Sequence, residues 1–369
     1  MLLQPMQHRH EIPTPALLLD LDAFERNLQA MAQLVAARGL FLRPHGKTHK
    51  CPEIARRQIA AGAVGVCAAK LGEAEVFADA ALRGLLVTTP VVGASKISRA
   101  AALASRAPDT IFSVDDEQNV RDLDAEADRA GVIMNLAVDL DFGRTGIAPG
   151  EPARALAERI DRLPHVRFAG LQAYDAAASH VPRFEDRRVR SRESMARALE
   201  TRDLIERSGI PCPLVSGGST GTCLIDRDID GITELQPGSY VFMDADYLRL
   251  EGPGGEAYRT FARALTVITT VVSRGPARAI VDGGFKAFAT DRSFAPEPVD
   301  LPGVTYAWAG DEHGRLDTAR AARDLRVGDR VEFVPPHCDP TINLYDRLYI
   351  TRGDRLEDIW PVAARGRSD

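Results

Sequence analysis

The sequence predicts an N-terminal (β/α)8 TIM-like barrel followed by a mostly antiparallel β domain. Up to about residue 248, short apolar runs alternate with helical patterns, which is typical of a parallel sheet with crossover helices. Beyond that point the runs become strand-like and helical patterns are scarce. The 369 residues are 45% hydrophobic, which is enough for two cores. We therefore assign residues 14–248 to the barrel, and residues 1–13 and 249–369 to the β-rich domain.

The barrel prediction depends on eight apolar runs that end in polar residues. Asp22 is expected to cap a helix that precedes them, and Gly39 to close it. A doubly wound open sheet is the alternative, but no GxGxxG follows the first strand to support a dinucleotide site. The eight predicted strands are 40–42, 64–67, 85–87, 110–114, 132–138, 166–171, 213–215 and 232–235.

A glycine-rich segment at 251–255 marks the change to the second domain. We expect the tail from Ala363 to Asp369 to be loose. The predicted strands of this domain, separated by Gly, Pro and Asp turns, are 264–272, 279–282, 304–308, 331–334 and 347–351.

The composition narrows the classes of function. A net charge of −6 argues against a nucleic-acid or anionic-membrane surface. Five scattered cysteines without a CxxC pair suggest neither a disulfide framework nor a zinc cluster, and fit a reducing cytoplasm. The N-terminus lacks a signal-peptide pattern, and no apolar run is long enough to span a bilayer. We expect a cytoplasmic protein whose partners are small molecules.

Lys47 is the first candidate for chemistry. It lies in the segment Arg-Pro-His-Gly-Lys-Thr-His-Lys (43–50), directly after a predicted strand, where a parallel barrel has its active site. Crowding by the neighbouring cations Arg43 and Lys50 would lower its pKa and favour Schiff-base formation with a carbonyl. The alternative is a basic loop that stays solvated or binds an anion.

Two glycine-rich turns follow the last predicted strands. Ser-Gly-Gly-Ser-Thr-Gly-Thr (216–222) and Gln-Pro-Gly-Ser-Tyr (236–240) expose successive backbone N–H groups, which can bind a phosphate. Either could instead be an ordinary tight turn. Together with Lys47, they point to a phosphate-bearing aldehyde, and pyridoxal 5'-phosphate (PLP) is such a cofactor.

A metal site is suggested near the end of the chain. His337 and Asp339 are two residues apart, so in an extended segment they would project to one side and Cys338 to the other. One imidazole and one carboxylate, completed by water and substrate, suit a divalent ion. Without further context, a lone histidine beside a turn aspartate is the better explanation of the pair.

These motifs cover nearly the whole chain and resemble a known family. The Pro-Thr-Pro lead-in, the Lys47 segment, Asp-Phe-Gly-Arg-Thr-Gly-Ile (141–147), the 216–222 turn and the His-x-Asp pair are similar to the D-threonine aldolase and D-serine dehydratase group of alanine-racemase-like PLP enzymes. His-x-Asp resembles the metal pair of the aldolases, whereas the dehydratases look like His-x-Cys.

The resemblance implies roles for individual residues. Lys47 would hold the cofactor, Arg144 would pair with its phenolic oxygen, Tyr174 would lie by the ring nitrogen, and His180 would act near the substrate hydroxyl. His337 and Asp339 would bind the metal, with Mn²⁺ expected and Mg²⁺ or Zn²⁺ as alternatives. The phosphate candidates are Gly217, Gly218, Ser219, Thr220, Gly238, Ser239 and Tyr240.

Related enzymes build their sites at a dimer interface, so the resemblance also implies a homodimer in which Asp311 or His313 could reach the partner's site. The expected function is metal-dependent cleavage of D-threonine and related D-3-hydroxy-α-amino acids to glycine and an aldehyde. The alternative is a dehydratase acting on D-serine or D-threo-3-hydroxyaspartate. A racemase, a non-catalytic PLP-binding protein and a cofactor-free barrel hydrolase are further readings.

Overall fold

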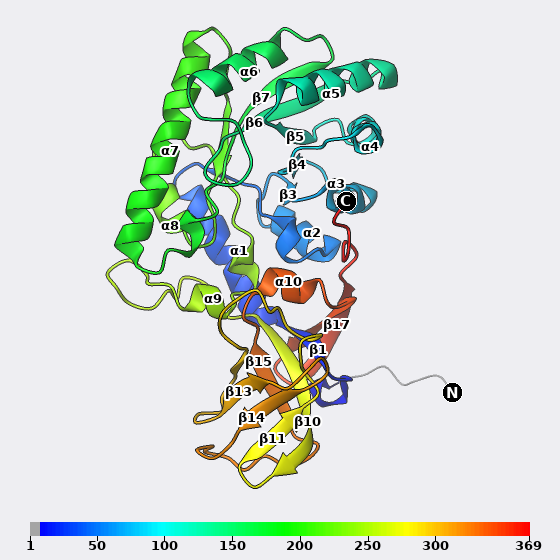
Figure 1. Cartoon of the computed structure of the whole chain (residues 1–369), viewed down its shortest axis with the longest axis vertical. Coiled ribbons are helices and arrows are strands. Elements are labelled where there is room, and N and C mark those ends of the chain that lie inside the picture. The colour runs from blue at the N-terminus through cyan, green and yellow to red at the C-terminus, as the bar shows by residue number, and fades with distance from the viewer. Residues whose placement is uncertain (1–7) are drawn as a thin grey trace.

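The computed structural model describes residues 8–369, so the part of the N-terminal assignment that covers residues 1–7 lies outside the described residues. The chain forms an eight-stranded parallel sheet and a nine-stranded mixed sheet. In Figure 1 the helix-covered barrel is the upper body and the second sheet lies below it.

The eight predicted barrel strands are confirmed. They are short and buried, because in a parallel barrel both faces of the sheet are covered. The parallel bridge between His45 and Cys67 joins the two ends of the sheet and closes it. In sheet order the strands are β2 (Phe41–Leu42), β9 (Glu234–Leu235), β8 (Leu214–Gly217), β7 (Val166–Ala173), β6 (Met134–Asp139), β5 (Ile111–Val114), β4 (Leu85–Val87) and β3 (Val66–Ala68).

Helices follow most barrel strands and surround the barrel (Figure 1). The first helix is capped by Asp20, whose side chain accepts a hydrogen bond from the Ala23 N–H at 3.0 Å. The expectation that Asp22 is the cap was therefore wrong, because the cap lies two residues earlier. Asp20 ends a strand and is therefore already in the extended conformation that a cap requires. The α-helices are α1 (Leu21–Ala36), α2 (Pro52–Ala60), α3 (Leu71–Asp79), α4 (Ala94–Arg106), α5 (Glu117–Ala130), α6 (Glu151–Asp161), α7 (Phe184–Arg207), α8 (Cys223–Asp226), α9 (Ala245–Leu248) and α10 (Cys338–Ile342).

The second sheet is mostly antiparallel, as expected, but it takes one strand from the range assigned to the barrel. β1 (Ala16–Asp20) pairs antiparallel with β10 (Leu265–Gly275) and parallel with β16 (Arg347–Arg352). The barrel therefore does not begin at residue 14 as predicted, because this apolar strand is buried within the second sheet. The other strands are β10 (Leu265–Gly275), β11 (Arg278–Val281), β12 (Glu297–Pro298), β13 (Thr305–Trp308), β14 (Gly314–Asp317), β15 (Arg330–Val334), β16 (Arg347–Arg352) and β17 (Arg355–Pro361).

The C-terminal segment packs on the barrel, contrary to the expectation that it is loose. Ala364 is fully buried, and its N–H donates to the Lys50 carbonyl at 3.0 Å. The Asp369 carbonyl accepts from Gly72 N–H, and its side chain lies 2.6 Å from Arg99. This segment therefore ties the second domain to the loop that carries Lys47.

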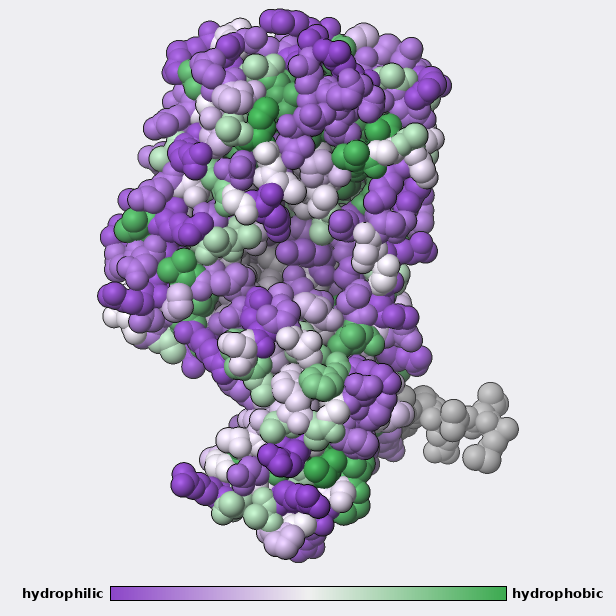
Figure 2. Space-filling view, viewed as in Figure 1, coloured by the Kyte–Doolittle hydropathy of each residue, from purple (hydrophilic) through white to green (hydrophobic). Residues whose placement is uncertain are grey.

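The surface is mixed in character. In the view of Figure 2 hydrophilic residues cover most of the barrel face, and hydrophobic residues are scattered among them. Across residues 8–369, no helix has the length and apolar character needed to span a bilayer.

Candidate active site

A pocket lies where the carboxyl ends of the barrel strands meet α9 and α10, which is the functional end of this kind of barrel. Its volume is about 150 Å³. It is lined by His45, Lys47, Thr48, Arg144, Tyr174, Ala176, His180, Ser219, Thr220, Gln236, Gly238, Ser239, Tyr247, His337 and Asp339. The structure thus brings most of the predicted site residues to one cavity.

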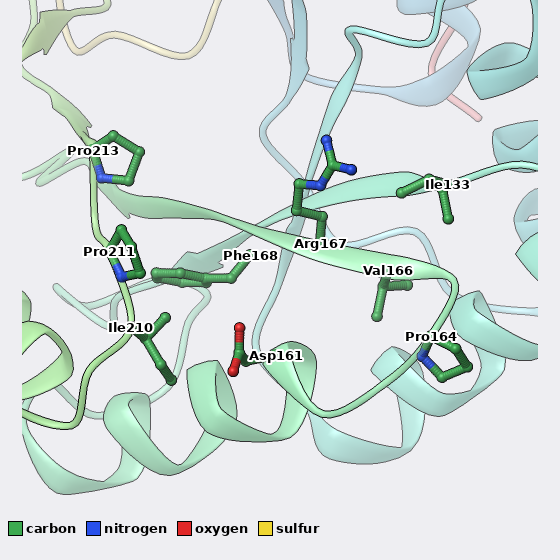
Figure 3. Close-up of a pocket in the computed structure, with 9 residues that line it drawn as sticks. All are labelled: Ile133, Asp161, Pro164, Val166, Arg167, Phe168, Ile210, Pro211 and Pro213. Atoms are coloured by element: carbon green, nitrogen blue, oxygen red, sulfur yellow. The ribbon is translucent and has the colours of Figure 1, made fainter.

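A larger cavity of about 400 Å³ lies at the opposite end of the barrel, beside the start of β7 and the segment before β8 (Figure 3). Proline and aliphatic side chains form much of its wall, and Asp161 and Arg167 are its only charged lining residues. None of the predicted site residues reaches it. The candidate chemistry therefore belongs to the smaller pocket.

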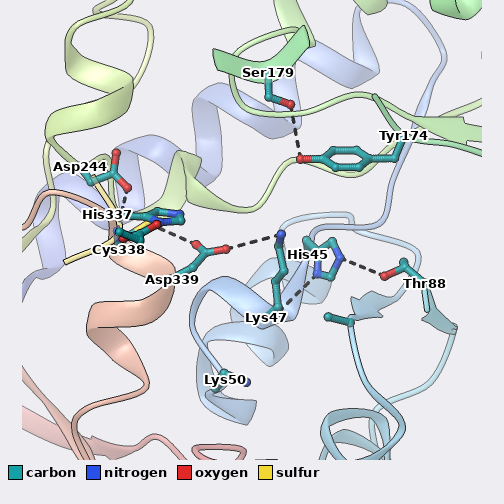
Figure 4. Close-up of polar contacts among 12 residues, drawn as sticks. His45, Lys47, Lys50, Thr88, Tyr174, Ser179, Asp244, His337, Cys338 and Asp339 are labelled. Carbon is teal, nitrogen blue, oxygen red and sulfur yellow. Dashed lines mark hydrogen bonds and ion pairs between the residues drawn. The ribbon is translucent and has the colours of Figure 1, made fainter. Parts of the chain in front are cut away.

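Lys47 lies in a single 3₁₀ turn, η2 (Gly46–Thr48), and its Nζ is 3.7 Å from Asp339 Oδ2 (Figure 4). Burial lowers the pKa of the Lys47 amine, but Asp339 and Tyr174 together outweigh that effect and the pKa is raised. The expected lowering by neighbouring cations is therefore wrong. Arg43 pairs with Glu234 at 2.8 Å and Lys50 with Glu73, so both cations are neutralised away from the amine.

His45 is neutral rather than a further cation. Burial, helped by the positive charge of Lys47, holds its pKa well below the ordinary value. Its Nδ1 accepts a hydrogen bond from the Lys47 backbone N–H at 3.4 Å. Its Nε2 lies 3.3 Å from Thr88 Oγ1, and the Thr88 hydroxyl donates its hydrogen bond to the Ala68 carbonyl. These partners place the ring proton on Nε2 and fix the base of the Lys47 turn.

His337 and Asp339 reach the pocket from the N-terminus of α10. His337 caps this helix and Asp339 lies in its first turn, so the predicted extended segment is wrong, although both side chains still line the cavity. Cys338, between them, is fully buried and outside the lining. Its N–H donates to Asp244 Oδ2 at 2.7 Å, which holds the start of the helix (Figure 4).

The side chains of His337 and Asp339, at the start of α10, are suited to bind a cation. Burial opposes ionisation of Asp339, but Lys47 and His337 outweigh it and lower the pKa to about 2. His337 Nδ1 lies 2.7 Å from Asp291 Oδ2, so a proton on Nδ1 leaves Nε2 as the ligand atom. Residues 8–369 contain no cluster of three or more His, Cys, Asp or Glu side chains suited to a metal. The pair therefore fits a divalent ion only as two ligands of an open site.

His180 ends the 3₁₀ turn η3 (Ala178–His180) and stacks at an angle on Tyr247, with ring centroids 4.9 Å apart. Its Nδ1 lies 2.9 Å from Asp246 Oδ2. Burial raises the pKa of Asp246, but the contacts with His180 and Arg292 outweigh it and hold the pKa below its usual value. An ionised carboxylate only accepts, so a proton on Nδ1, beside Asp246, would leave Nε2 as the basic ring nitrogen.

The remaining lining residues fit PLP. Arg144 lies over the Tyr174 ring, 5.4 Å from its centroid, and no carboxylate within residues 8–369 forms an ion pair with its guanidinium, which could therefore bind a phenolate. Thr220 Oγ1 is buried and has no hydrogen-bond partner in the described part of the chain, which leaves it available to a phosphate. At Gly238 a Cβ atom would lie 2.3 Å from Thr48 Oγ1, so the absence of a side chain keeps this part of the cavity open.

Three of the predicted phosphate residues do not line the pocket. Gly217 is part of β8, and Gly218 adopts a left-handed φ of +73° beside Asp226. Tyr240 is fully buried, and its hydroxyl accepts from Gln58 Nε2 at 3.2 Å, so its side chain faces the core. Asp311 and His313 are exposed between β13 and β14, outside the lining, and their role toward a partner subunit stays a prediction.

Several residues that line the pocket or contact its histidines were not predicted from the sequence. Thr48 lines the cavity and could have been chosen, because it follows Lys47 in the segment 43–50, whereas Tyr247 belongs to no pattern typical of a site. Gln236 could have been chosen, because it follows the end of β9 directly. Asp246 and Asp291 are adjacent to the two histidines only in the fold, and no local signal identifies them.

A closed parallel barrel with a lysine in the pocket at its carboxyl end, followed by a second β domain, is the architecture of PLP-dependent barrel enzymes. Residues 19–246 match the family model described as "Alanine racemase, N-terminal domain", and residues 264–351 match "Putative serine dehydratase domain". The chain therefore belongs to the alanine-racemase-like family, whose members depend on PLP.

Individual relatives narrow the class. The chain is 38% identical to a 3-hydroxy-D-aspartate aldolase of Paracoccus denitrificans (strain Pd 1222), covering 98% of this chain and 95% of the relative. It is also 38% identical to a D-threonine aldolase of an Arthrobacter species, covering 99% and 96%. The crystal structure of D-threonine aldolase from Filomicrobium marinum superposes with a TM-score of 0.95 at 40% identity, covering 99% and 100%. Aldolases are lyases, and this chain is an enzyme of that class.

Proposed function

We propose that the chain is a metal-dependent PLP aldolase that cleaves the Cα–Cβ bond of D-3-hydroxy-α-amino acids such as D-threonine, releasing glycine and an aldehyde. The observation that carries the proposal is the convergence of three functions on one cavity. Lys47 supplies an amine, His180 a proton acceptor, and His337 with Asp339 two metal ligands. The relatives named as aldolases support the same reaction type.

Lys47 and Arg144 would hold the cofactor at its carbonyl and phenolic positions, and Thr220 with the Gly238 turn would accommodate the phosphate. When bound, PLP supplies an electron sink for the pair released by the broken bond. His337 Nε2 and Asp339 would hold a divalent ion, whose charge makes a neighbouring hydroxyl more acidic. The open coordination of the pair leaves room for that hydroxyl.

The protein's own groups then move the protons. His180 Nε2 is free because Asp246 occupies Nδ1, so this nitrogen removes the proton of the β-hydroxyl. Loss of that proton drives formation of the aldehyde carbonyl as the Cα–Cβ bond breaks. Lys47 Nζ, close to the carboxylate of Asp339, carries the proton that is delivered to Cα of glycine.

The dehydratase alternative is less well supported. It requires removal of the Cα proton and expulsion of the hydroxyl as water, for which a thiolate ligand is the expected variant. Here the second ligand position is a carboxylate, Asp339, and the adjacent thiol of Cys338 is buried outside the pocket. Burial raises the pKa of that thiol well above its ordinary value, so it stays protonated.

The proposal is tested by incubating the PLP-loaded enzyme with D-threonine and Mn²⁺, in parallel with a chelated sample and with the Asp339→Asn variant. We expect glycine and acetaldehyde in the first sample and a loss of both products in the other two. Ammonia and 2-oxobutanoate from the wild type would make the chain a dehydratase. If glycine and acetaldehyde still form after exhaustive chelation, the reaction does not depend on a metal.

A further inference from the structure

A single arginine connects the two histidines of the site. Arg292 Nε lies 2.8 Å from Asp246 Oδ2, and Arg292 Nη1 lies 3.0 Å from Asp291 Oδ2. These are the oxygen atoms that contact His180 Nδ1, at 2.9 Å, and His337 Nδ1, at 2.7 Å. The result is a continuous path from His180 through Asp246, Arg292 and Asp291 to His337.

We propose that Arg292 is a positioning residue that fixes His180 and His337 relative to each other, so that the base and the metal ligand act on the same substrate hydroxyl. The inference rests on the proposed function for its catalytic meaning. The planar guanidinium holds its N–H groups in a rigid fork, so two carboxylates bound to one fork have a fixed separation. Each carboxylate in turn fixes the orientation of one imidazole ring.

The two ends of this path belong to different structural units. Asp246 is on α9, which follows the barrel, whereas Asp291 and Arg292 lie in the loop between β11 and β12. That loop is fastened to α10, because Ala289 N–H donates to Thr341 Oγ1 at 3.0 Å. Arg292 therefore spans from the metal-binding unit to the unit that carries the base.

The path is only partly exposed to solvent. The side chains of Arg292 and Asp246 are 24% and 17% exposed and that of His337 is 17% exposed, whereas Asp291 is 40% exposed. The contact between Arg292 and Asp246 is therefore screened less than a surface pair, and removal of Arg292 would leave both carboxylates without their shared cation. Loss of Arg292 should therefore disturb both histidines at once.

Arg249 provides a matched control. It follows α9 directly and contacts Phe294 of the same loop, with its guanidinium 3.5 Å from the ring centroid, and it pairs with Glu297, the first residue of β12, at 2.5 Å. Among its contacts in residues 8–369 there is no carboxylate that holds His180 or His337. An effect of tethering alone would appear in both arginine variants, whereas an effect of positioning would appear only at Arg292.

The first measurement is Mn²⁺ affinity of the PLP-loaded enzyme without substrate, by calorimetric titration, for wild type, Arg292→Gln, Arg292→Lys and Arg249→Gln. We expect the affinity of Arg292→Gln to fall about 10–100-fold, the usual effect of losing a group that orients a metal-bound histidine. At saturating Mn²⁺, kcat for D-threonine should also fall, with little change in KM and with the cofactor absorbance retained. Arg249→Gln should resemble the wild type.

Arg292→Lys keeps the charge but lacks the fork, so a retained defect assigns the effect to geometry. If Arg292→Gln does not fold, the Mn²⁺ affinity and the kcat of Arg292→Lys test the inference instead. A metal affinity and a saturated kcat both within about twofold of wild type, or equal losses in Arg249→Gln, would overturn the inference.

A second readout separates this inference from the proposed function. Imidazole ¹⁵N NMR of the metal-free enzyme reports the tautomers of His180 and His337 without any turnover. We expect the Nδ1–H form of both rings in wild type and in Arg249→Gln, and mixed tautomers in Arg292→Gln. If the wild type cleaves no hydroxy amino acid but the tautomers still depend on Arg292, the positioning role stands and the proposed reaction fails. Tautomers unaffected by both Arg292 variants would refute the positioning role.

Discussion

Lys47 Nζ lies 3.7 Å from Asp339 Oδ2, and these two residues come from different domains. Lys47 follows the first strand of the barrel, whereas Asp339 lies on α10, within the C-terminal domain. The contact brings the proposed cofactor-binding position and the proposed metal-binding position into one cavity. It also explains why the Lys47 amine has a raised rather than a lowered pKa in the absence of bound groups.

Replacement of Lys47 by alanine should abolish both turnover and the covalent attachment of PLP. The pocket then lacks its only lysine, so borohydride treatment should leave no reduced cofactor on the protein. Mass spectrometry after reduction measures the attachment directly. Lys96→Ala, in α4 and away from the pocket, is the control and should label as the wild type does. Labelling that persists in Lys47→Ala would assign the attachment to another residue.

His180→Gln should lower kcat by about 10²–10⁴-fold, the usual contribution of a general base. The amide cannot take up the hydroxyl proton, but the metal ligands and Lys47 remain in place. Mn²⁺ affinity and the cofactor spectrum should therefore be close to those of the wild type. His165→Gln, at a site beside Asp124 and Asp128, is the control for a general effect of histidine loss. A kcat within threefold of wild type in His180→Gln, roughly at the limit of ordinary variation, would exclude the role.

Gly238→Ala should weaken PLP binding. The new methyl group would lie 2.3 Å from Thr48 Oγ1 and 3.3 Å from His45 Cβ, so the pocket floor must shift. Overpacking costs about 1–3 kcal/mol, which corresponds to a loss of about 10–100-fold in affinity. Fluorescence titration of the apoenzyme with PLP measures it. Gly275→Ala, where only the flexible Arg278 side chain is close, should leave the affinity unchanged, and equal affinities for both variants would contradict the assignment of Gly238 to the phosphate site.

Asp226 should make the protein less stable as pH rises. Burial raises the pKa of this carboxyl from 3.8 to about 6, against the hydrogen bonds from Ser191 and Thr222. The folded state therefore binds the proton more tightly than the unfolded state, and stability falls between about pH 4 and pH 6, by about 3 kcal/mol in all. Urea unfolding at pH 4 and pH 8 should show a smaller loss in Asp226→Asn than in wild type. The exposed Asp230→Asn should keep the wild-type loss; an unchanged loss in Asp226→Asn would disprove the assignment.

The barrel could be predicted because its strands are buried on both faces and therefore read as short apolar runs between helical patterns. Chemistry-bearing residues were found where the chain order places them at strand ends, as with Lys47 and Tyr174. The strand β1 was assigned to the wrong domain, because its apolar sequence does not reveal which sheet it joins.

The electrostatics of the site could not be predicted, since the decisive partners are distant in sequence. Arg43 and Lys50 are close to Lys47 along the chain, but Glu234 and Glu73 hold them elsewhere. Tyr240 shares a turn with Gly238, yet its ring points into the core toward Gln58. Arg292 belongs to no motif, and only the fold brings it between Asp246 and Asp291.

The central claim is that the chain breaks the Cα–Cβ bond of a D-3-hydroxy amino acid at the Lys47 pocket. The most direct test is proton NMR of the products formed from D-threonine in D₂O by the enzyme loaded with PLP and Mn²⁺. The account predicts acetaldehyde and glycine in equal amounts, with one deuterium delivered to Cα of the glycine. Deuterated threonine of either configuration without acetaldehyde would indicate a racemase, and 2-oxobutanoate with ammonia a dehydratase; either result would contradict the account.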